Sequence, residues 1–189
     1  MCKRKVFILK SISFYNNIKV MFAYDCYSNW LFIYLIIERG LKMARRVFFS
    51  FKYKQDVSRA MVVRNSWVTQ EREAAGFIDA ADFEKLKKQG PTAIKNWIDK
   101  QLVGTSVTVV LVGEKTCVSR WIKYEIEKSK AEGKGILGID ISKIRDLQGK
   151  TSERCGRIPK GYDFYLWNND DGYNKMGNWI EKAAKEAGR

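Results

Sequence analysis

The chain of 189 residues contains no histidine at all. This absence excludes Ser-His-Asp and Cys-His catalysis, histidine zinc ligands and a histidine general base. Its four cysteines, at positions 2, 26, 117 and 155, form no C-x-x-C pair, so neither a zinc ribbon nor a thioredoxin-type site is predicted. We expect reduced thiols in a cytoplasmic protein, with Cys117 packed as a structural residue rather than acting as a nucleophile.

Other motifs are missing too. The sequence has no G-x-G-x-x-G and no G-x-x-x-x-G-K-[ST], which excludes the Rossmann and P-loop nucleotide sites. The apolar run Trp30–Ile37 is too short to cross a bilayer, so no membrane partner is expected. The formal net charge is +14, but the basic residues are scattered without a dense block. That distribution favours an anionic ligand and solubility over nucleic-acid binding.

The first 42 residues differ from the rest in being basic and rich in aromatic side chains. Glu38-Arg39-Gly40 can be encoded by an unbroken purine run that resembles a bacterial ribosome-binding sequence, a short spacer before the Met43 codon. We therefore expect Met43 to be the natural start, with residues 1–42 as translated leader and 43–189 as the domain. The alternative is a membrane-associating or packing arm.

Strands and helices alternate along the body of the chain. Apolar runs predict strands, and a period near 3.6 predicts helices. The strands are expected at 46–51, 77–79, 107–112, 136–141 and 163–167, and the helices at 56–75, 91–102, 120–132 and 173–184. Residues 80–90 read as a polar loop, and 142–162 as a long basic linker. This order predicts an α/β fold with a flavodoxin-like, doubly wound, five-stranded parallel sheet in three layers.

One segment combines a buried strand with a possible ligand-facing side chain. Ser119 is a suitable N-cap for a helix that follows the strand 107–112. Trp121 and Glu125 stand four residues apart on one stripe of that helix. From spacing alone, such a pair is typical of a half-buried aromatic ring and a solvated carboxylate. Near the carboxyl end of a parallel strand, however, it lies where open α/β sheets bind ligands.

Five segments, in order and spacing, resemble bacterial TIR-like domains, most closely the TIR protein of the Thoeris anti-phage defence system. They are Val47–Phe51, Val62–Val68, Thr105–Gly113, Arg120–Ile126 and Asp170–Lys175. The resemblance covers roughly residues 43–180. A response-regulator receiver is excluded, because Phe-Ser-Phe and Val-Gly stand where its acidic strand ends belong.

The resemblance also implies a site. In NAD-cleaving TIR domains the glutamate of Trp-x-x-x-Glu is catalytic, which assigns that role to Glu125. Trp121 and Phe51 would pack the site, and Ser50 and Lys52 would contact the sugar or phosphate. Asp82 is a substrate-binding candidate by its position in the segment that covers the nucleotide, and its neighbours Phe83 and Glu84 are candidates by position alone.

The implied reaction is cleavage of the bond between nicotinamide and ribose in NAD+, which is the substrate; no cofactor and no metal are expected. One carboxylate can stabilise the oxocarbenium-like ribose without a histidine. Capture by an adenine nitrogen gives a cyclic ADP-ribose-type signal for an effector protein of the same defence system. Whether the protein assembles into a homo-oligomer is left open by the sequence. The alternatives are a non-catalytic TIR interaction scaffold and a basic nucleic-acid-binding protein.

Overall fold

In the computed structural model the chain divides into two compact units, Met1–Met43 and Ala44–Arg189. The structure describes residues 12–15, 18–21, 45–69 and 72–189. In the first unit β1 (Ile12–Tyr15) pairs antiparallel with β2 (Ile18–Met21). The predicted boundary at Met43 lies outside the described residues.

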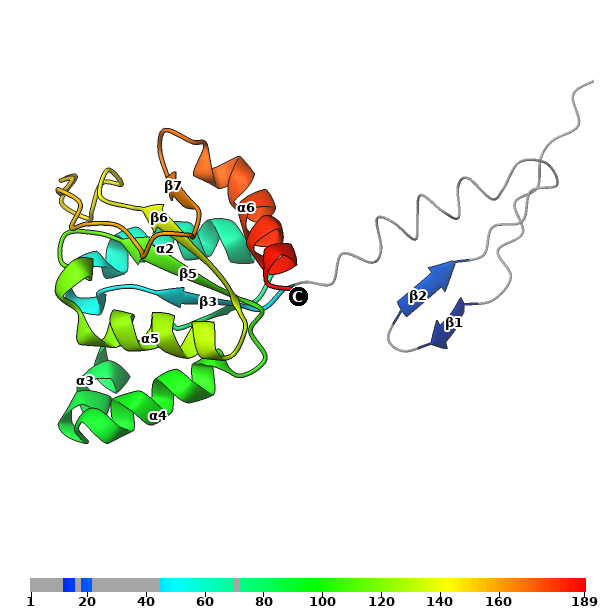
Figure 1. Cartoon of the computed structure of the whole chain (residues 1–189), viewed down its shortest axis with the longest axis horizontal. Helices are drawn as coiled ribbons and strands as arrows, with labels where there is room; N and C mark the ends of the chain where they lie inside the picture. The colour runs from blue at the N-terminus through cyan, green and yellow to red at the C-terminus, as the bar shows by residue number, and fades with distance from the viewer. Residues whose placement is uncertain (1–11, 16–17, 22–44, 70–71) are drawn as a thin grey trace, which may run out of the picture. The chain divides into compact units, whose positions relative to one another are not determined.

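The second unit is built on a five-stranded sheet in which every pairing is parallel (Figure 1). In spatial order its strands are β4 (Ala74–Ala75), β3 (Val47–Ser50), β5 (Val107–Val112), β6 (Gly135–Asp140) and β7 (Phe164–Leu166). The chain moves outward from β3 in one direction and returns to build the sheet in the other. The crevice between the ends of β3 and β5 is therefore the topological switch point, where such sheets bind ligands. The predicted fold class is confirmed.

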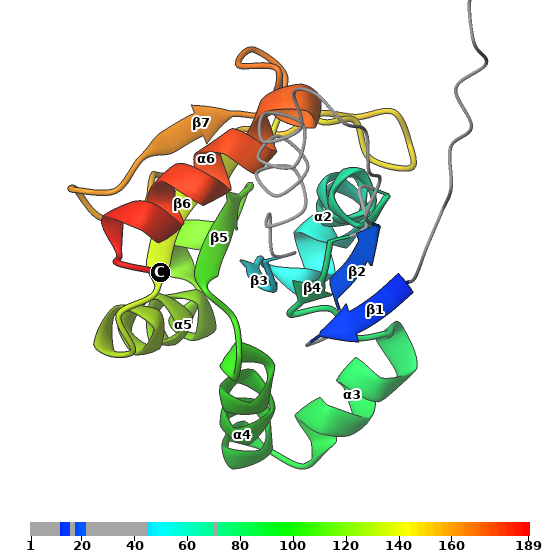
Figure 2. The same ribbon diagram turned by 90° about the vertical axis from the view of Figure 1, so that its right-hand side faces the viewer.

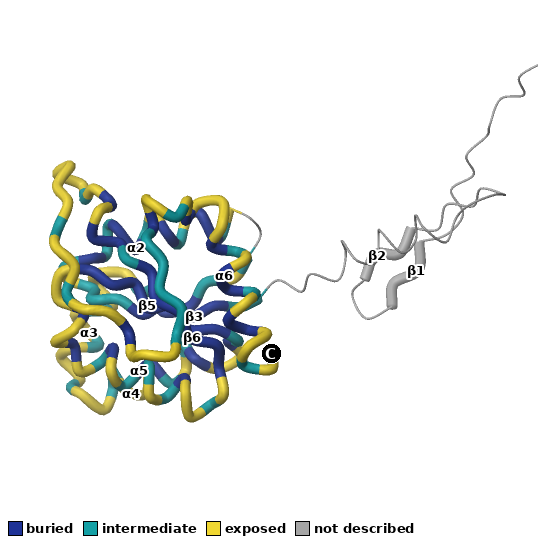
Figure 3. The backbone as a smooth tube through the Cα atoms, turned by 45° about the horizontal axis from the view of Figure 1, so that its top comes forward, coloured by how far each residue is buried: buried dark blue, intermediate teal, exposed yellow. Residues whose placement is uncertain are grey.

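Helices cover both faces of this sheet (Figures 1 and 2). They are α2 (Tyr53–Val68) and α6 (Gly172–Glu186) on one face, and α4 (Pro91–Leu102) and α5 (Arg120–Ala131) on the other, with α3 (Ala80–Lys88) beside α4. Successive strand residues point to opposite faces: Phe49 packs with Trp67 of α2, whereas Phe48 packs with Ile98 and Leu102 of α4. Both faces are thus buried, as Figure 3 shows for the strands.

The expected helix 56–75 and strand 77–79 are shifted in the structure. Helix α2 runs from Tyr53 to Val68, and the second strand is Ala74–Ala75, paired with Val47 and Phe48. Gly76 directly follows β4. It has a φ of 89°, and a Cβ atom there would lie 2.3 Å from the Phe49 carbonyl oxygen. The glycine is needed because β4 passes so close to β3.

The polar loop expected at residues 80–90 is wrong, because 80–88 form α3. The Asp79 side chain caps this helix by accepting a hydrogen bond from the Asp82 N–H at 2.8 Å. Lysines occupy the last turn, where they complement the helix dipole. No residue of α3 is fully buried. A short helix with so little apolar surface gives a pattern that is easily taken for a loop.

The prediction of reduced thiols is wrong for Cys117 and Cys155, which form a disulfide across a sequence separation of 38, whereas Cys2 and Cys26 lie outside the described residues. Cys117 is exposed rather than packed. Its partner lies in the segment between β6 and β7, which folds back over the end of β5: the Cys155 N–H donates to the Gly113 carbonyl at 2.9 Å. The spacing of the two cysteines gives no sign of this contact.

Candidate functional site

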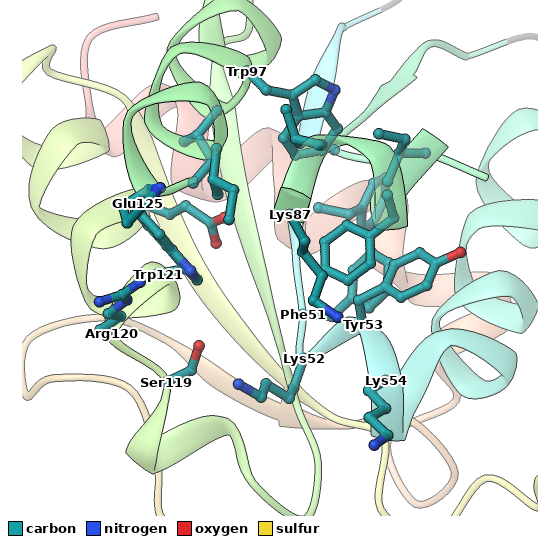
Figure 4. A pocket seen from close by; sticks show the side chains of 18 of the residues that line it. Phe51, Lys52, Tyr53, Lys54, Lys87, Trp97, Ser119, Arg120, Trp121 and Glu125 are labelled. Atoms are coloured by element: carbon teal, nitrogen blue, oxygen red, sulfur yellow. The ribbon is translucent and has the colours of Figure 1, made fainter. Parts of the chain in front are cut away.

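A cavity of about 480 Å³ opens at the carboxyl end of β3 (Figure 4). Its walls come from segments far apart in the sequence: the end of β3, the first turn of α2, α3, α4 and the first turns of α5. The last residue of β3, Ser50, pairs with Val110 of β5, so the cavity lies beside the switch point. This is the position at which the fold is expected to hold a ligand.

Glu125 lies on the α5 side of this cavity, and its side chain points inward (Figure 4). The residue is only 7% exposed. The Ser50 hydroxyl donates to its Oε2 at 2.5 Å, and among the described residues no cation forms an ion pair with it. Burial raises the pKa of Glu125 to about 8, although the hydrogen bond from Ser50 acts to lower it. A positively charged ligand would favour the carboxylate form.

Several contacts fix the helix that carries this glutamate. Ser119 caps α5 by accepting from the Ile122 N–H at 3.4 Å, as predicted. One turn after Glu125, the Ser129 hydroxyl donates to the Glu125 carbonyl at 2.6 Å and lies 2.6 Å from the Thr108 hydroxyl of β5. Both hydroxyls are fully buried. The carboxyl group therefore projects from a backbone that is held against the sheet.

Aromatic rings form two sides of the cavity (Figure 4). Trp121 lies on the side of Glu125, and Phe51 and Tyr53 lie opposite. The Tyr53 ring stacks on Phe83 of α3 with centroids 4.3 Å apart, and on Phe51 with centroids 6.1 Å apart. Flat apolar walls of this kind suit a ligand with planar rings.

The charge of the lining is strongly positive. Four cationic side chains line the cavity, namely Lys52, Lys54, Lys87 and Arg120, and Glu125 is the single acid among the lining residues. Lys87 also lies over the Phe83 ring, 5.6 Å from its centroid. The cavity therefore combines a buried carboxyl group, aromatic walls and several cations.

The structure brings together four of the six predicted site residues. Phe51, Lys52, Trp121 and Glu125 line the cavity. Ser50 is 1% exposed and lies behind Glu125, where its hydroxyl meets the carboxyl group rather than the lining. Asp82 is exposed on α3 and pairs with Lys85 at 2.8 Å, away from the cavity lining.

Sequence reasoning did not assign four of the lining residues, namely Tyr53, Leu86, Lys87 and Trp97, whereas it named Phe83 as a candidate by position alone. A signal existed for part of this wall. Phe83, Leu86 and Lys87 recur at helical spacing, so a helix over 80–88 would have placed all three on one face.

A parallel α/β domain with a buried glutamate in a cavity at its switch point defines a TIR-like domain. Residues 48–146 match the family model described as "Thoeris protein ThsB, TIR-like domain". A protein of Bacillus cereus (strain MSX-D12), named "Putative cyclic ADP-D-ribose synthase ThsB1", is 41% identical over 139 residues, which are 72% of this chain and 72% of that protein. The chain belongs to the Thoeris ThsB TIR-like family, which confirms the resemblance drawn from the sequence.

Proposed function

We propose that the protein is an NAD+-cleaving enzyme of anti-phage defence that forms a cyclic ADP-ribose-type nucleotide. The observation that carries the proposal is the Glu125 carboxyl group, which is buried beside an aromatic cavity, accepts a hydrogen bond from Ser50 and has no partner cation within the described part of the chain. A buried carboxyl group costs stability unless it is paired. Its presence beside a ligand-sized cavity therefore favours a chemical role. The name of the Bacillus cereus relative points to the same reaction.

The chemistry needs one well-placed negative charge. Nicotinamide leaves C1′ of the ribose with the electron pair of the broken bond and becomes neutral, while the ribose becomes an oxocarbenium ion. Glu125, ionised beside this cation, stabilises the developing charge. Attack by an adenine nitrogen closes the ring, and attack by water with loss of a proton gives ADP-ribose instead. NAD+ is the substrate, and no metal or cofactor enters these steps.

The lining cations suit the pyrophosphate of the substrate. Lys52, Lys54 and Arg120 lie along one edge of the cavity in Figure 4, and Lys87 approaches from α3. Charge-assisted hydrogen bonds to phosphate oxygens are among the stronger ones in proteins. Binding the two phosphates there leaves the nicotinamide ribose for the Glu125 end of the cavity and the adenine for the aromatic walls.

The setting is the cytoplasm, where NAD+ is available. Among the described residues no helix is long and apolar enough to cross a membrane. An effector of the same defence system responds to the diffusible nucleotide, so the two proteins need not touch. Self-assembly into a homo-oligomer is compatible with this arrangement.

The test is Glu125→Gln, which keeps the shape of the side chain and removes its charge. Nicotinamide release and cyclic nucleotide are measured by mass spectrometry in phage-challenged cells and with purified protein. We expect a loss of about 10³-fold. Glu127→Gln is the matched control, because Glu127 is exposed on the same helix. Unchanged product from the Glu125 variant rejects the proposal, and partner binding without NAD+ cleavage by the wild type favours a scaffold.

A further inference from the structure

The disulfide joins two segments at the carboxyl edge of the sheet. Cys117 lies in the 3-10 turn η1 (Thr116–Val118) after β5, and Cys155 lies in the segment between β6 and β7. Their Cα atoms are 5.4 Å apart, within the range that a disulfide spans. The hydrogen bond from the Cys155 N–H to Gly113 holds the two backbones together independently of the sulfur atoms. The pair can therefore re-form after reduction.

One end of this bond belongs to the cavity wall. Ser119, two residues after Cys117, caps α5 and lines the cavity, as does Trp121 in the first turn. Glu125 follows in the next turn of the same helix. A covalent bond at Cys117 thus limits the movement of the turn from which the catalytic helix begins.

The other end holds a segment with few buried apolar side chains, whose polar contacts include ion pairs of Asp146 with Arg59 and of Arg154 with Asp140. Within 142–162 most side chains are exposed or half-buried. Ile158 packs against Val112 and Ile122, and the buried Arg59 donates to the Ile144 carbonyl at 2.8 Å. The disulfide adds a covalent anchor between these two contacts. Segments with few apolar anchors open at low free-energy cost, so the loss of this bond is felt locally.

Small thiols can reach the bond, because Cys117 is exposed and Cys155 is half-buried. Reduction proceeds by thiol–disulfide exchange. A thiolate attacks one sulfur and displaces the other cysteine as a thiolate; a second thiol then releases the mixed disulfide. Two low-molecular-weight thiols leave as one disulfide, and both cysteines end as thiols. Arg154 and Arg157, next to the pair in the sequence, favour an anionic reagent.

We propose that Cys117 and Cys155 form a redox modification site that controls the rigidity of the cavity wall. As a disulfide, the pair fixes the first turn of α5 and with it Trp121 and Glu125. As two thiols, it releases that turn and the segment 142–162. Cytosolic disulfides are rare and commonly redox-sensing, so the bonded form marks oxidising conditions. The effect on mobility stands by itself, whereas an effect on catalysis rests on the proposed function.

The experiment compares the full chain after dithiothreitol and after glutathione disulfide, with thiol labelling to count free cysteines. Hydrogen exchange followed by mass spectrometry is the main readout. We expect reduction to speed exchange at 113–123 roughly tenfold, because the opening equilibrium is no longer constrained, and to leave α6 unchanged. Cys117→Ser with Cys155→Ser should exchange fast in both conditions. Cys2→Ser with Cys26→Ser is the control that keeps the redox response.

The outcomes separate this site from the enzymatic proposal. Free labelling of all four cysteines in oxidised protein, or equal exchange at 113–123 in both states of the wild type, overturns the modification site. If the enzyme is active, kcat should fall several-fold on reduction, since small misplacement of a catalytic group is costly. A redox-dependent exchange rate with no NAD+ cleavage in either state removes the proposed function and leaves the modification site standing.

Discussion

Among the residues that the structure describes, each face of the sheet buries one carboxyl group near the carboxyl edge, and the two groups differ in their surroundings. Asp56 of α2 is fully buried and lies 3.6 Å from the Arg59 guanidinium. Glu125 of α5 has a serine hydroxyl as its partner and faces a cavity of about 480 Å³. Burial raises the pKa of both, to about 6 for Asp56, where Arg59 opposes the effect, and to about 8 for Glu125.

The comparison shows that a raised pKa does not by itself identify a catalytic acid. Asp56 is packed against the end of β5 so closely that a Cβ atom on Gly113 would lie 2.2 Å from its Oδ1. No ligand can reach a carboxyl group enclosed in this way. Glu125 has the same chemistry beside open space and aromatic walls, so its surroundings, rather than its pKa, make it the candidate.

The largest difference between the two groups should be in the dependence of stability on pH. A carboxyl group with a folded-state pKa above its unfolded value stabilises the fold fully only below the unfolded pKa, and that contribution is lost as pH rises through the folded pKa. For Glu125 the loss runs from about 4.5 to about 8, and for Asp56 from about 3.8 to about 6. Glu125→Gln should therefore gain up to about 5 kcal/mol over wild type above pH 8.

Urea unfolding at several pH values measures this prediction. Asp56→Asn should change the pH dependence of stability only below about pH 6, and by less, because the pKa of Asp56 is raised less far above its unfolded value than that of Glu125. A Glu125→Gln protein that tracks the wild type from pH 5 to pH 9 would show that the glutamate is already ionised and solvated. The contrast between the two carboxyl groups would then fail.

The second prediction concerns the packed side of the comparison. Gly113→Ala places a methyl group where the Asp56 carboxylate now lies, and overpacking of this kind costs about 2–3 kcal/mol. Thermal unfolding should show a lower Tm for this variant. Gly113→Ala combined with Asp56→Ala relieves the collision, so the two substitutions should be strongly non-additive. A purely additive loss would mean that the carboxylate moves aside without cost.

The sequence predicted the parts of the molecule that depend on local pattern. Continuous apolar runs located β3, β5 and β6, and the cap at Ser119 located the start of α5. Glu125 was assigned its role through the resemblance of Trp121-x-x-x-Glu125 to the motif of TIR domains, because the spacing alone is typical of a solvated carboxylate. These signals lie within a few residues of one another, so no knowledge of the tertiary structure is needed to see them.

What the sequence could not predict depends on contacts between distant segments. Ser50 and Glu125 are 75 residues apart, and their hydrogen bond requires both the register of β3 and the docking of α5. Ser50 was therefore expected to touch the substrate instead of the catalytic group. The Cys117–Cys155 disulfide joins residues that are 38 positions apart, and it could not be predicted for the same reason. The wall from α3 was missed because a short polar helix resembles a loop.

The smallest predicted effect tests the partner that distinguishes Glu125 from Asp56. The Ser50 hydroxyl favours the ionised form of Glu125, so Ser50→Ala should raise the pKa of Glu125 further above 8. If the carboxylate is the reactive form, kcat/KM in the free enzyme rises with pH through this pKa. The variant should then shift that limb to higher pH and lose roughly fivefold in kcat/KM at pH 7, about 1 kcal/mol.

Ser129→Ala is the control, because it removes a backbone contact on the same helix. It should lower activity without moving the limb. Equal pH profiles for wild type and Ser50→Ala would show that the serine acts only in packing, and burial alone would then set the pKa of Glu125, whereas at Asp56 on the opposite face Arg59 opposes the effect of burial.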